Sequence, residues 1–191
     1  MTRKYELKRR AERQEETRRR IVEAAVELHR TKGPARTTLS DVARRAGVQR
    51  HTLYRHFPDE RALFTACSGR FYELNPFPEP EPWLAIADPE ERLRAGLTAI
   101  YDYFERTEDM LTTTVRDAEV HPLTQEVAKL RRGPMVERVT GVLGEHLPDT
   151  PRVRAALALA LDFYTWRSLV RRSGLSNDEA VETMVAALRC Q

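Results

Sequence analysis

The stretch that decides the fold is residues 38–57, which read TLSDVARRAGVQRHTLYRHF. Thr38, followed three positions later by Asp41, forms a capping-box pattern that predicts the start of a helix. Gly47 supplies the positive φ that lets a second helix leave at a steep angle, and the small Ala43 allows the two helices to approach closely. The stretch therefore predicts a helix-turn-helix. Three apolar side chains are expected on its inner faces: Val42, Val48 and Leu53.

The second helix of this motif places polar side chains on its outer face. Side chains of these types hydrogen-bond base edges in the major groove or phosphate oxygens. The candidates for such contacts are Gln49, Arg50, His51, Thr52 and Arg55. The stretch therefore predicts a DNA-binding surface.

Four short runs carry a resemblance to a known family: Asp41-Val42-Ala43, Ala46-Gly47-Val48, Thr52-Leu53-Tyr54 and His56-Phe57-Pro58. From about Thr17 to Phe64, and most strongly over Leu39–Leu63, the chain resembles the tetracycline-repressor (TetR) family. The resemblance implies phosphate contacts by Tyr54 and His56 and a backbone contact by Thr38. It places four residues at base-reading positions: Gln49, Arg50, His51 and Thr52.

These roles imply different effects of substitution. Arg50→Ala is expected to relax base preference at one symmetric pair of positions in the DNA. Tyr54→Phe is expected to weaken binding to all sequences alike, because a phosphate contact carries no sequence information.

Three positions differ from what is common in that family. Gln49 stands where a serine is common and is a poorer N-cap. His51 replaces a residue that is usually small, so it either reads the groove itself or changes the docking depth. Glu60 stands where a phosphate-contacting lysine is common, and its carboxylate would repel DNA. Arg61 beside it is the candidate to compensate.

Charge is distributed unevenly along the chain. Residues 1–64 hold 17 Lys and Arg against 9 Asp and Glu, a net of +8, whereas residues 65–191 hold 15 against 20, a net of −5. Such asymmetry suggests a polyanion-binding N-terminal part. The basic arm, residues 1–16, either contacts DNA or stays solvated. Its basic residues are Arg3, Lys4, Lys8, Arg9, Arg10 and Arg13.

Helical periodicity runs through nearly the whole chain, which predicts an all-α fold. A first helix ends at Gly33-Pro34, and the four prolines of residues 75–83 predict a stiff connector. The other expected helices cover about 38–46, 49–56, 59–74, 89–106, 107–116, 122–147 (interrupted at Gly133-Pro134), 151–172 and 176–190. We expect a helix-turn-helix DNA-binding domain at 17–64 and a C-terminal regulatory and dimerisation domain at 65–191.

Large side chains of the C-terminal part could line a ligand cavity or form an ordinary core. The cavity candidates are Trp83, Tyr101, Phe104, Met110, Phe163 and Trp166. Asp162 joins them because it interrupts the apolar run ALALALDFYTW (156–166), where a buried carboxylate needs a partner. That partner could be water, a distant arginine or a polar group of a ligand.

Residues 153–170 carry more apolar surface than one neighbour covers. With residues 176–190 they predict a helix pair that packs on a second copy of the chain; a single large core is the alternative. The candidate dimer residues are Leu157, Leu161, Tyr164, Val181, Met184, Val185 and Leu188.

Several functional classes are disfavoured by the sequence. No apolar run approaches the ~20 residues of a membrane span, and the N-terminal residues lack the apolar segment of a signal peptide. The two cysteines are far apart, the five histidines lack metal-ligand spacing, and neither a glycine-rich phosphate loop nor a nucleophile elbow is present. We therefore expect no enzymatic activity, cofactor or metal, and the resemblance implies a cytoplasmic, nucleoid-associated bacterial protein.

Together these features predict a homodimeric, sequence-specific transcriptional regulator. The resemblance implies a repressor that a small-molecule ligand releases from a palindromic operator in double-stranded DNA. The alternative is a sequence-indifferent nucleoid or adaptor protein that binds DNA phosphates.

Overall fold

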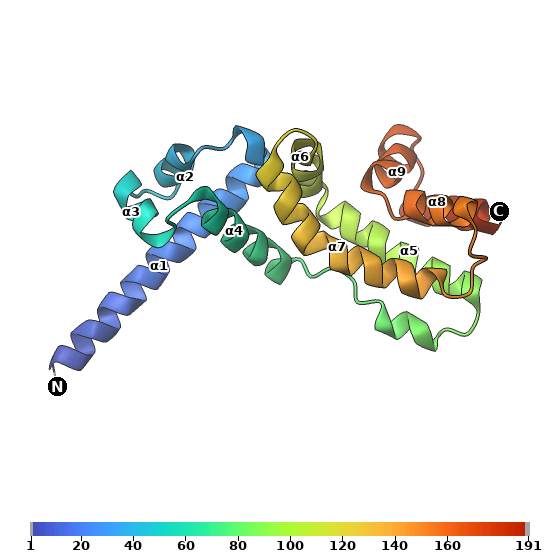
Figure 1. Ribbon diagram of the computed structural model, residues 1–191, viewed down its shortest axis with the longest axis horizontal. Helices are drawn as coiled ribbons and strands as arrows, with labels where there is room; N and C mark the ends of the chain where they lie inside the picture. Colours follow the sequence, from blue (N-terminus) through green and yellow to red (C-terminus); the bar gives the residue numbers. More distant parts are fainter. Residues whose placement is uncertain (1, 190–191) are drawn as a thin grey trace. The chain divides into compact units, whose positions relative to one another are not determined.

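The computed structural model describes residues 2–189, with side chains from Tyr5 onward. Every regular element in this range is helical, which confirms the expected all-α class (Figure 1). The α-helices are α1 (Thr2–Thr31), α2 (Leu39–Arg45), α3 (Arg50–His56), α4 (Glu60–Leu74), α5 (Pro89–Arg106), α6 (Glu108–Ala118), α7 (Pro122–Gly144), α8 (Pro151–Ala160), α9 (Phe163–Arg167) and α10 (Asn177–Arg189). Shorter elements are the 3-10 helices η1 (Pro34–Arg36) and η2 (Glu81–Ala85) and the π-helix η3 (Ser168–Arg172). Among the helices of residues 2–189, none is both long and apolar enough to cross a membrane.

The chain forms two compact units, each built from segments that are separate in sequence. The first unit contains the residues up to Asn75 and the segment Asp109–Lys129. The second unit contains Pro76–Glu108 and the residues from Leu130 onward. The functional division predicted from the sequence follows the chain instead, with boundaries at residues 16 and 64, and it stays a prediction.

The first unit is organised around α1. The buried stripe of this helix includes Ile21 and Ala25, which pack in one cluster with Val42, Leu53 and Phe57 of the following elements. The part of α1 that precedes this stripe extends beyond the helices that pack on it (Figure 1). Its basic side chains from Lys8 to Arg13 are exposed, whereas the side chains of Arg3 and Lys4 lie outside the described residues. The predicted DNA contact of this arm stays a prediction.

Helix α4 follows its predicted bounds, but its buried stripe is shorter than the sequence pattern indicates. Leu63 and Cys67 are buried as expected, whereas Leu74 is 59% exposed. The periodic pattern of α4 continues for two turns past Cys67, beyond the cluster that α4 shares with α1. The apolar spacing of Leu63, Cys67, Phe71 and Leu74 therefore indicates a longer buried stripe than the structure has.

Two helix boundaries in the second half of the chain differ from the sequence prediction. Helix α7 runs through Gly133-Pro134 without the expected interruption. A proline inside a helix removes one hydrogen bond, a cost that a long helix with packed turns on both sides tolerates. The single helix expected over 151–172 is instead divided after Ala160, and Asp162 caps the next helix by accepting a hydrogen bond from the Thr165 amide at 2.9 Å.

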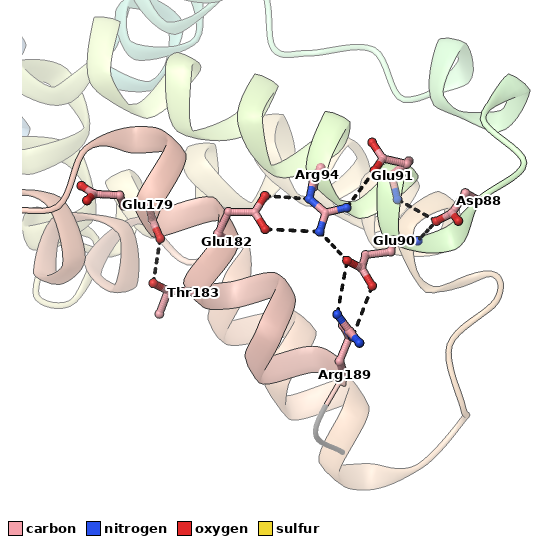
Figure 2. A network of polar contacts seen from close by, with 8 residues as sticks. All are labelled: Asp88, Glu90, Glu91, Arg94, Glu179, Glu182, Thr183 and Arg189. Carbon is pink, nitrogen blue, oxygen red and sulfur yellow. Dashed lines mark hydrogen bonds and ion pairs between the residues drawn. The ribbon is translucent and has the colours of Figure 1, made fainter.

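In the second unit α10 packs against both α5 and α8, and a polar network joins α5 to α10 at their surface (Figure 2). The Arg94 guanidinium of α5 donates to both carboxylate oxygens of Glu182, at 2.6 and 3.2 Å, and also to Glu90. Arg189 pairs with Glu90 from the last turn of α10 at 3.2 Å. Exposed ion pairs contribute little stability each, so this network mainly fixes how α10 lies along α5.

A buried histidine joins three helices of the first unit. His29 of α1 is 7% exposed, its Nδ1 lies 3.5 Å from the Cys67 sulfur of α4, and its carbonyl accepts a hydrogen bond from Thr113 of α6 at 2.7 Å. Burial lowers the pKa of His29 to about 4, against a smaller opposing effect of Asp117. Burial also raises the pKa of the Cys67 thiol.

The shifted pKa of His29 predicts a pH-dependent stability. Between the unfolded value of about 6.5 and the folded value of about 4, the unfolded chain binds more protons, so acidification favours unfolding. We expect the free energy of unfolding to fall by about 3 kcal/mol as the pH drops through this window. Urea unfolding at pH 7.5, 6 and 5 measures this fall. In His29→Phe the free energy of unfolding should depend less on pH. A wild-type free energy that does not change between pH 7.5 and 5 would contradict the prediction.

Candidate nucleic-acid interface

The start of the motif is fixed by the predicted capping box. The Asp41 amide donates to the Thr38 hydroxyl at 3.1 Å, and the Asp41 carboxylate accepts from the Thr38 amide at 3.2 Å. Hydrogen bonds from the Lys32 side chain and from Thr38 hold the pKa of Asp41 well below its usual range. The capping carboxylate is therefore ionised at neutral pH, and the side chain of Thr38 is tied to the first turn of α2.

The turn between α2 and α3 has the expected geometry. Gly47 has φ +65°, and the Val48 amide returns a hydrogen bond to the Ala43 carbonyl at 3.0 Å. Ala43 is buried between the helices, as is Leu53 of α3. Because Leu53 points inward, the residues around it on α3 are turned outward.

The outer face of α3 carries the predicted contact residues. Five of them are exposed: Gln49, Arg50, His51, Tyr54 and Arg55. Thr52 and His56 are half-buried. Gln49 occupies the N-cap of α3 without a side-chain hydrogen bond, as expected for this residue type. The structure thus brings the α3 candidates together on one short helix, with Thr38 at the start of the helix before it.

His56 is more enclosed than a simple phosphate contact requires. Within the described part of the chain its buried Nε2 atom has no hydrogen-bond partner. Burial, and then the nearby charges of Arg55 and Arg18, lower the pKa of His56. Its ring therefore favours the neutral form, and any phosphate contact would use the other nitrogen, Nδ1.

Arg18 is a candidate that the sequence interpretation missed. Its guanidinium lies over the ring of Phe57, 4.4 Å from the centroid, and so brings a positive charge from α1 to the end of α3. The available signal was its spacing, because Arg18 lies three residues before Ile21 and seven before Ala25, on the helix face that is otherwise apolar. An arginine on that face indicates a specific partner.

Arg61 was expected to compensate for Glu60 but has a partner of its own. Its guanidinium makes two hydrogen bonds to the carboxylate of Glu126 in α7, one of them at 2.8 Å between Nη2 and Oε2. This pairing lowers the pKa of Glu126. In this arrangement the guanidinium of Arg61 is paired with Glu126 within the first unit.

Four of the predicted ligand-binding residues come together in the second unit. The Phe163 ring lies 5.6 Å from both Phe104 and Trp166, and the Tyr101 hydroxyl donates to the Ala160 carbonyl at 3.1 Å. Trp83 is buried in η2 of the same unit, whereas Met110 belongs to the first unit. The Asp162 carboxylate caps α9 and so has a backbone amide as one partner.

The predicted dimer residues divide by exposure. Leu157 of α8 and the candidates of α10 are buried within the second unit, Leu161 is half-buried, and Tyr164 is 39% exposed. Beside them in sequence, Leu159 is 57% exposed and was not among the candidates. The apolar surface that the single chain leaves open here is therefore on α8 and the start of α9. The buried candidates of α10 are Val181, Met184, Val185 and Leu188.

A capped helix, a glycine turn and a short helix with a polar outer face define a helix-turn-helix domain of the kind that inserts its second helix into the major groove. Residues 21–67 match the sequence pattern of the family described as bacterial regulatory proteins, tetR family. This match covers the helix-turn-helix region of the chain.

Similar proteins with known names are also regulators. The HTH-type transcriptional regulator TtgR of Pseudomonas putida is 40% identical over 69 residues, which are 36% of this chain and 33% of TtgR. YerO of Bacillus subtilis, an uncharacterized HTH-type regulator, is 28% identical over 114 residues, 59% of this chain and 39% of YerO. The chain thus spans about a third of the length of the curated relatives it matches first.

A solved structure extends the similarity to nearly the whole fold. NalD, the secondary repressor of the MexAB-OprM multidrug efflux pump in Pseudomonas aeruginosa, is 26% identical, with a TM-score of 0.64 over 94% of this chain and 96% of NalD. The named relatives are regulators rather than enzymes.

Proposed function

We propose that this protein is a sequence-specific, DNA-binding transcriptional regulator of the repressor type. The observation that carries the proposal is α3, where Leu53 is fully buried while Arg50, His51 and Tyr54 are exposed together. Such a helix offers donors and acceptors to base edges without disturbing its own packing. The tetR-family match of residues 21–67 and the likeness to the repressor NalD support the same assignment.

The proposal includes a homodimer on a palindromic operator. A two-fold dimer would present two copies of α3 to successive major grooves, ~34–36 Å apart. The exposed Leu159 and Tyr164 support an interface on α8 and α9. The α10 candidates are buried within the chain, so they would support the interface helices by packing inside the second unit rather than by contacting the second copy.

The proposal also includes release from DNA by a small-molecule effector. The effector would bind in the second unit, and this unit would also form the dimer. The aromatic group of Tyr101, Phe104, Phe163 and Trp166 is the candidate binding region. By linkage, operator DNA must then weaken effector binding by the same factor. The protein would act in the bacterial cytoplasm at the nucleoid.

A selection of bound duplexes from a random pool at physiological salt tests the proposal. An enriched inverted repeat supports it, and the half-site spacing would give the distance between the two recognition helices. Salt-sensitive binding without enrichment favours the sequence-indifferent alternative. Repeating the selection with protein that has been denatured and refolded removes a bound effector as the cause of a negative result.

The Arg61–Glu126 pair predicts a variant that binds DNA more tightly. In Glu126→Gln the Arg61 guanidinium loses its carboxylate partner and becomes available to phosphate. We expect an affinity gain on the order of fivefold, comparable to an exposed ion pair. The log–log salt slope should steepen by about 0.9 for one added phosphate contact. Fluorescence anisotropy across a salt series measures both.

Glu79→Gln is the matched control for this variant. Glu79 pairs with Arg138 in the second unit, so the substitution changes the net charge equally at a different place. An equal affinity gain in both variants would assign the effect to net charge and contradict a role for Arg61.

A further inference from the structure

Arg50 and Tyr54 contact one another one turn apart on the outer face of α3. The Arg50 Nη2 donates a hydrogen bond to the Tyr54 hydroxyl oxygen at 3.2 Å. The Arg50 guanidinium carbon also lies 5.6 Å from the centroid of the Tyr54 ring. Tyr54 is 38% exposed, so both groups are accessible on the surface that the proposed function assigns to DNA. The pair combines a hydrogen bond with a cation–π contact.

This contact restricts a side chain that is otherwise mobile. A free arginine samples many rotamers, and fixing one of them costs conformational entropy. The hydrogen bond and the cation–π contact with Tyr54 already restrict the position of the Arg50 guanidinium in the free protein. Part of the conformational entropy that the Arg50 side chain must lose for base recognition is therefore already lost before DNA binds.

The hydrogen-bonding capacity of the pair is not exhausted by this contact. Arginine has five N–H donors, and Arg50 uses one of them on Tyr54. Two of the remaining donors suffice for the O6 and N7 atoms of guanine, the commonest specific arginine contact in the major groove. The Tyr54 hydroxyl accepts from Arg50 and keeps its own hydrogen to donate to a phosphate oxygen. A donor polarised by a neighbouring cation makes a stronger hydrogen bond.

We propose that Tyr54 is a positioning residue for base recognition. It holds the Arg50 guanidinium toward a guanine in each half-site. The DNA phosphate, Tyr54, Arg50 and the base would then be linked by successive hydrogen bonds. The inference rests on the proposed function. It replaces the uniform weakening that the sequence alone predicts for Tyr54→Phe, because removal of the hydroxyl also releases Arg50.

The test compares the full-length wild type with Arg50→Ala, Tyr54→Phe and the double variant. Selection from a random duplex pool first identifies the symmetric base pair whose preference Arg50→Ala removes. The affinity of each protein is then measured for the selected operator and for one altered at that pair. We expect guanine there, and a wild-type preference on the order of tenfold.

Tyr54→Phe should lose most of this preference, although its ring remains. The double variant should show no further loss of preference than Arg50→Ala alone, because the two residues act through one contact. Arg55→Ala is the control: it removes an exposed cation from the same helix and should lower affinity without changing preference at that pair. Thermal unfolding of all variants should match the wild type, since the replaced side chains are exposed.

Two results would overturn the inference in distinguishable ways. If Tyr54→Phe weakens both duplexes by the same factor, Tyr54 contacts phosphate only, and the proposed function stands without this role. If the wild type enriches no sequence at all, the proposed function fails and the inference fails with it.

Discussion

Replacing Trp166 with alanine is expected to lower the free energy of unfolding by about 3–5 kcal/mol, the range for deleting a buried aromatic side chain. Trp166 is fully buried, and its ring lies 5.6 Å from Phe163 and 5.9 Å from Phe104. Its indole N–H donates to the Asn177 side chain at 2.9 Å. The substitution therefore removes apolar contacts and leaves an amide oxygen without its donor. Urea unfolding followed by far-UV circular dichroism measures the loss.

Trp166→Phe is the matched variant for this prediction. It keeps an aromatic ring but removes the hydrogen bond to Asn177, so we expect a loss of about 1–2 kcal/mol. The difference between the two variants gives the contribution of ring volume. An alanine variant as stable as the phenylalanine variant would show that Trp166 borders space rather than filling a core.

Gly33→Ala is expected to destabilise the first unit by about 3 kcal/mol, through backbone strain and a displaced carboxylate. Gly33 has φ +95°, a conformation that other residues rarely adopt. A Cβ atom there would overlap the carboxylate of Asp117. That carboxylate accepts a hydrogen bond from the Ala35 amide at 2.9 Å, so moving it leaves a backbone donor unpaired. Urea unfolding again gives the difference from wild type.

Gly174→Ala is the control that measures the cost of backbone strain without the overlap with a carboxylate. Gly174 also has a positive φ, of +77°, but no neighbouring atom within reach of an added Cβ. Gly174→Ala should therefore cost about 1 kcal/mol. Equal losses of unfolding free energy at the two glycines would mean that Asp117 moves without cost. That result would contradict a stabilising role for its hydrogen bond with the Ala35 amide.

Local signals predicted the first unit well. The capping box at Thr38 and the turn at Gly47 each depend on a few neighbouring residues, and both are present in the structure. The sequence interpretation also placed Leu53 inside and Arg50 and its neighbours outside, because helical periodicity fixes which side chains share a face.

Predictions that required knowledge of a distant partner were less successful. The pattern of α10 shows that Val185 is buried, but not whether its neighbour is α5 or a second chain. Asp162 looked like an isolated carboxylate until a helix break gave it the Thr165 amide. The pairing of Arg61 with Glu126 joins residues far apart in sequence, which no local spacing could indicate.

The contact of Asp117 with Ala35 also bears on the order in which the chain acquires its structure. The helix-turn-helix is synthesised early, yet the unit that holds it includes Asp109–Lys129. The hydrogen bonds from Thr113 to the His29 carbonyl and from the Ala35 amide to Asp117 each close a loop of about eighty residues. During translation the recognition helix therefore exists for some time without these supports, and the unit is completed only after α6 has emerged from the ribosome.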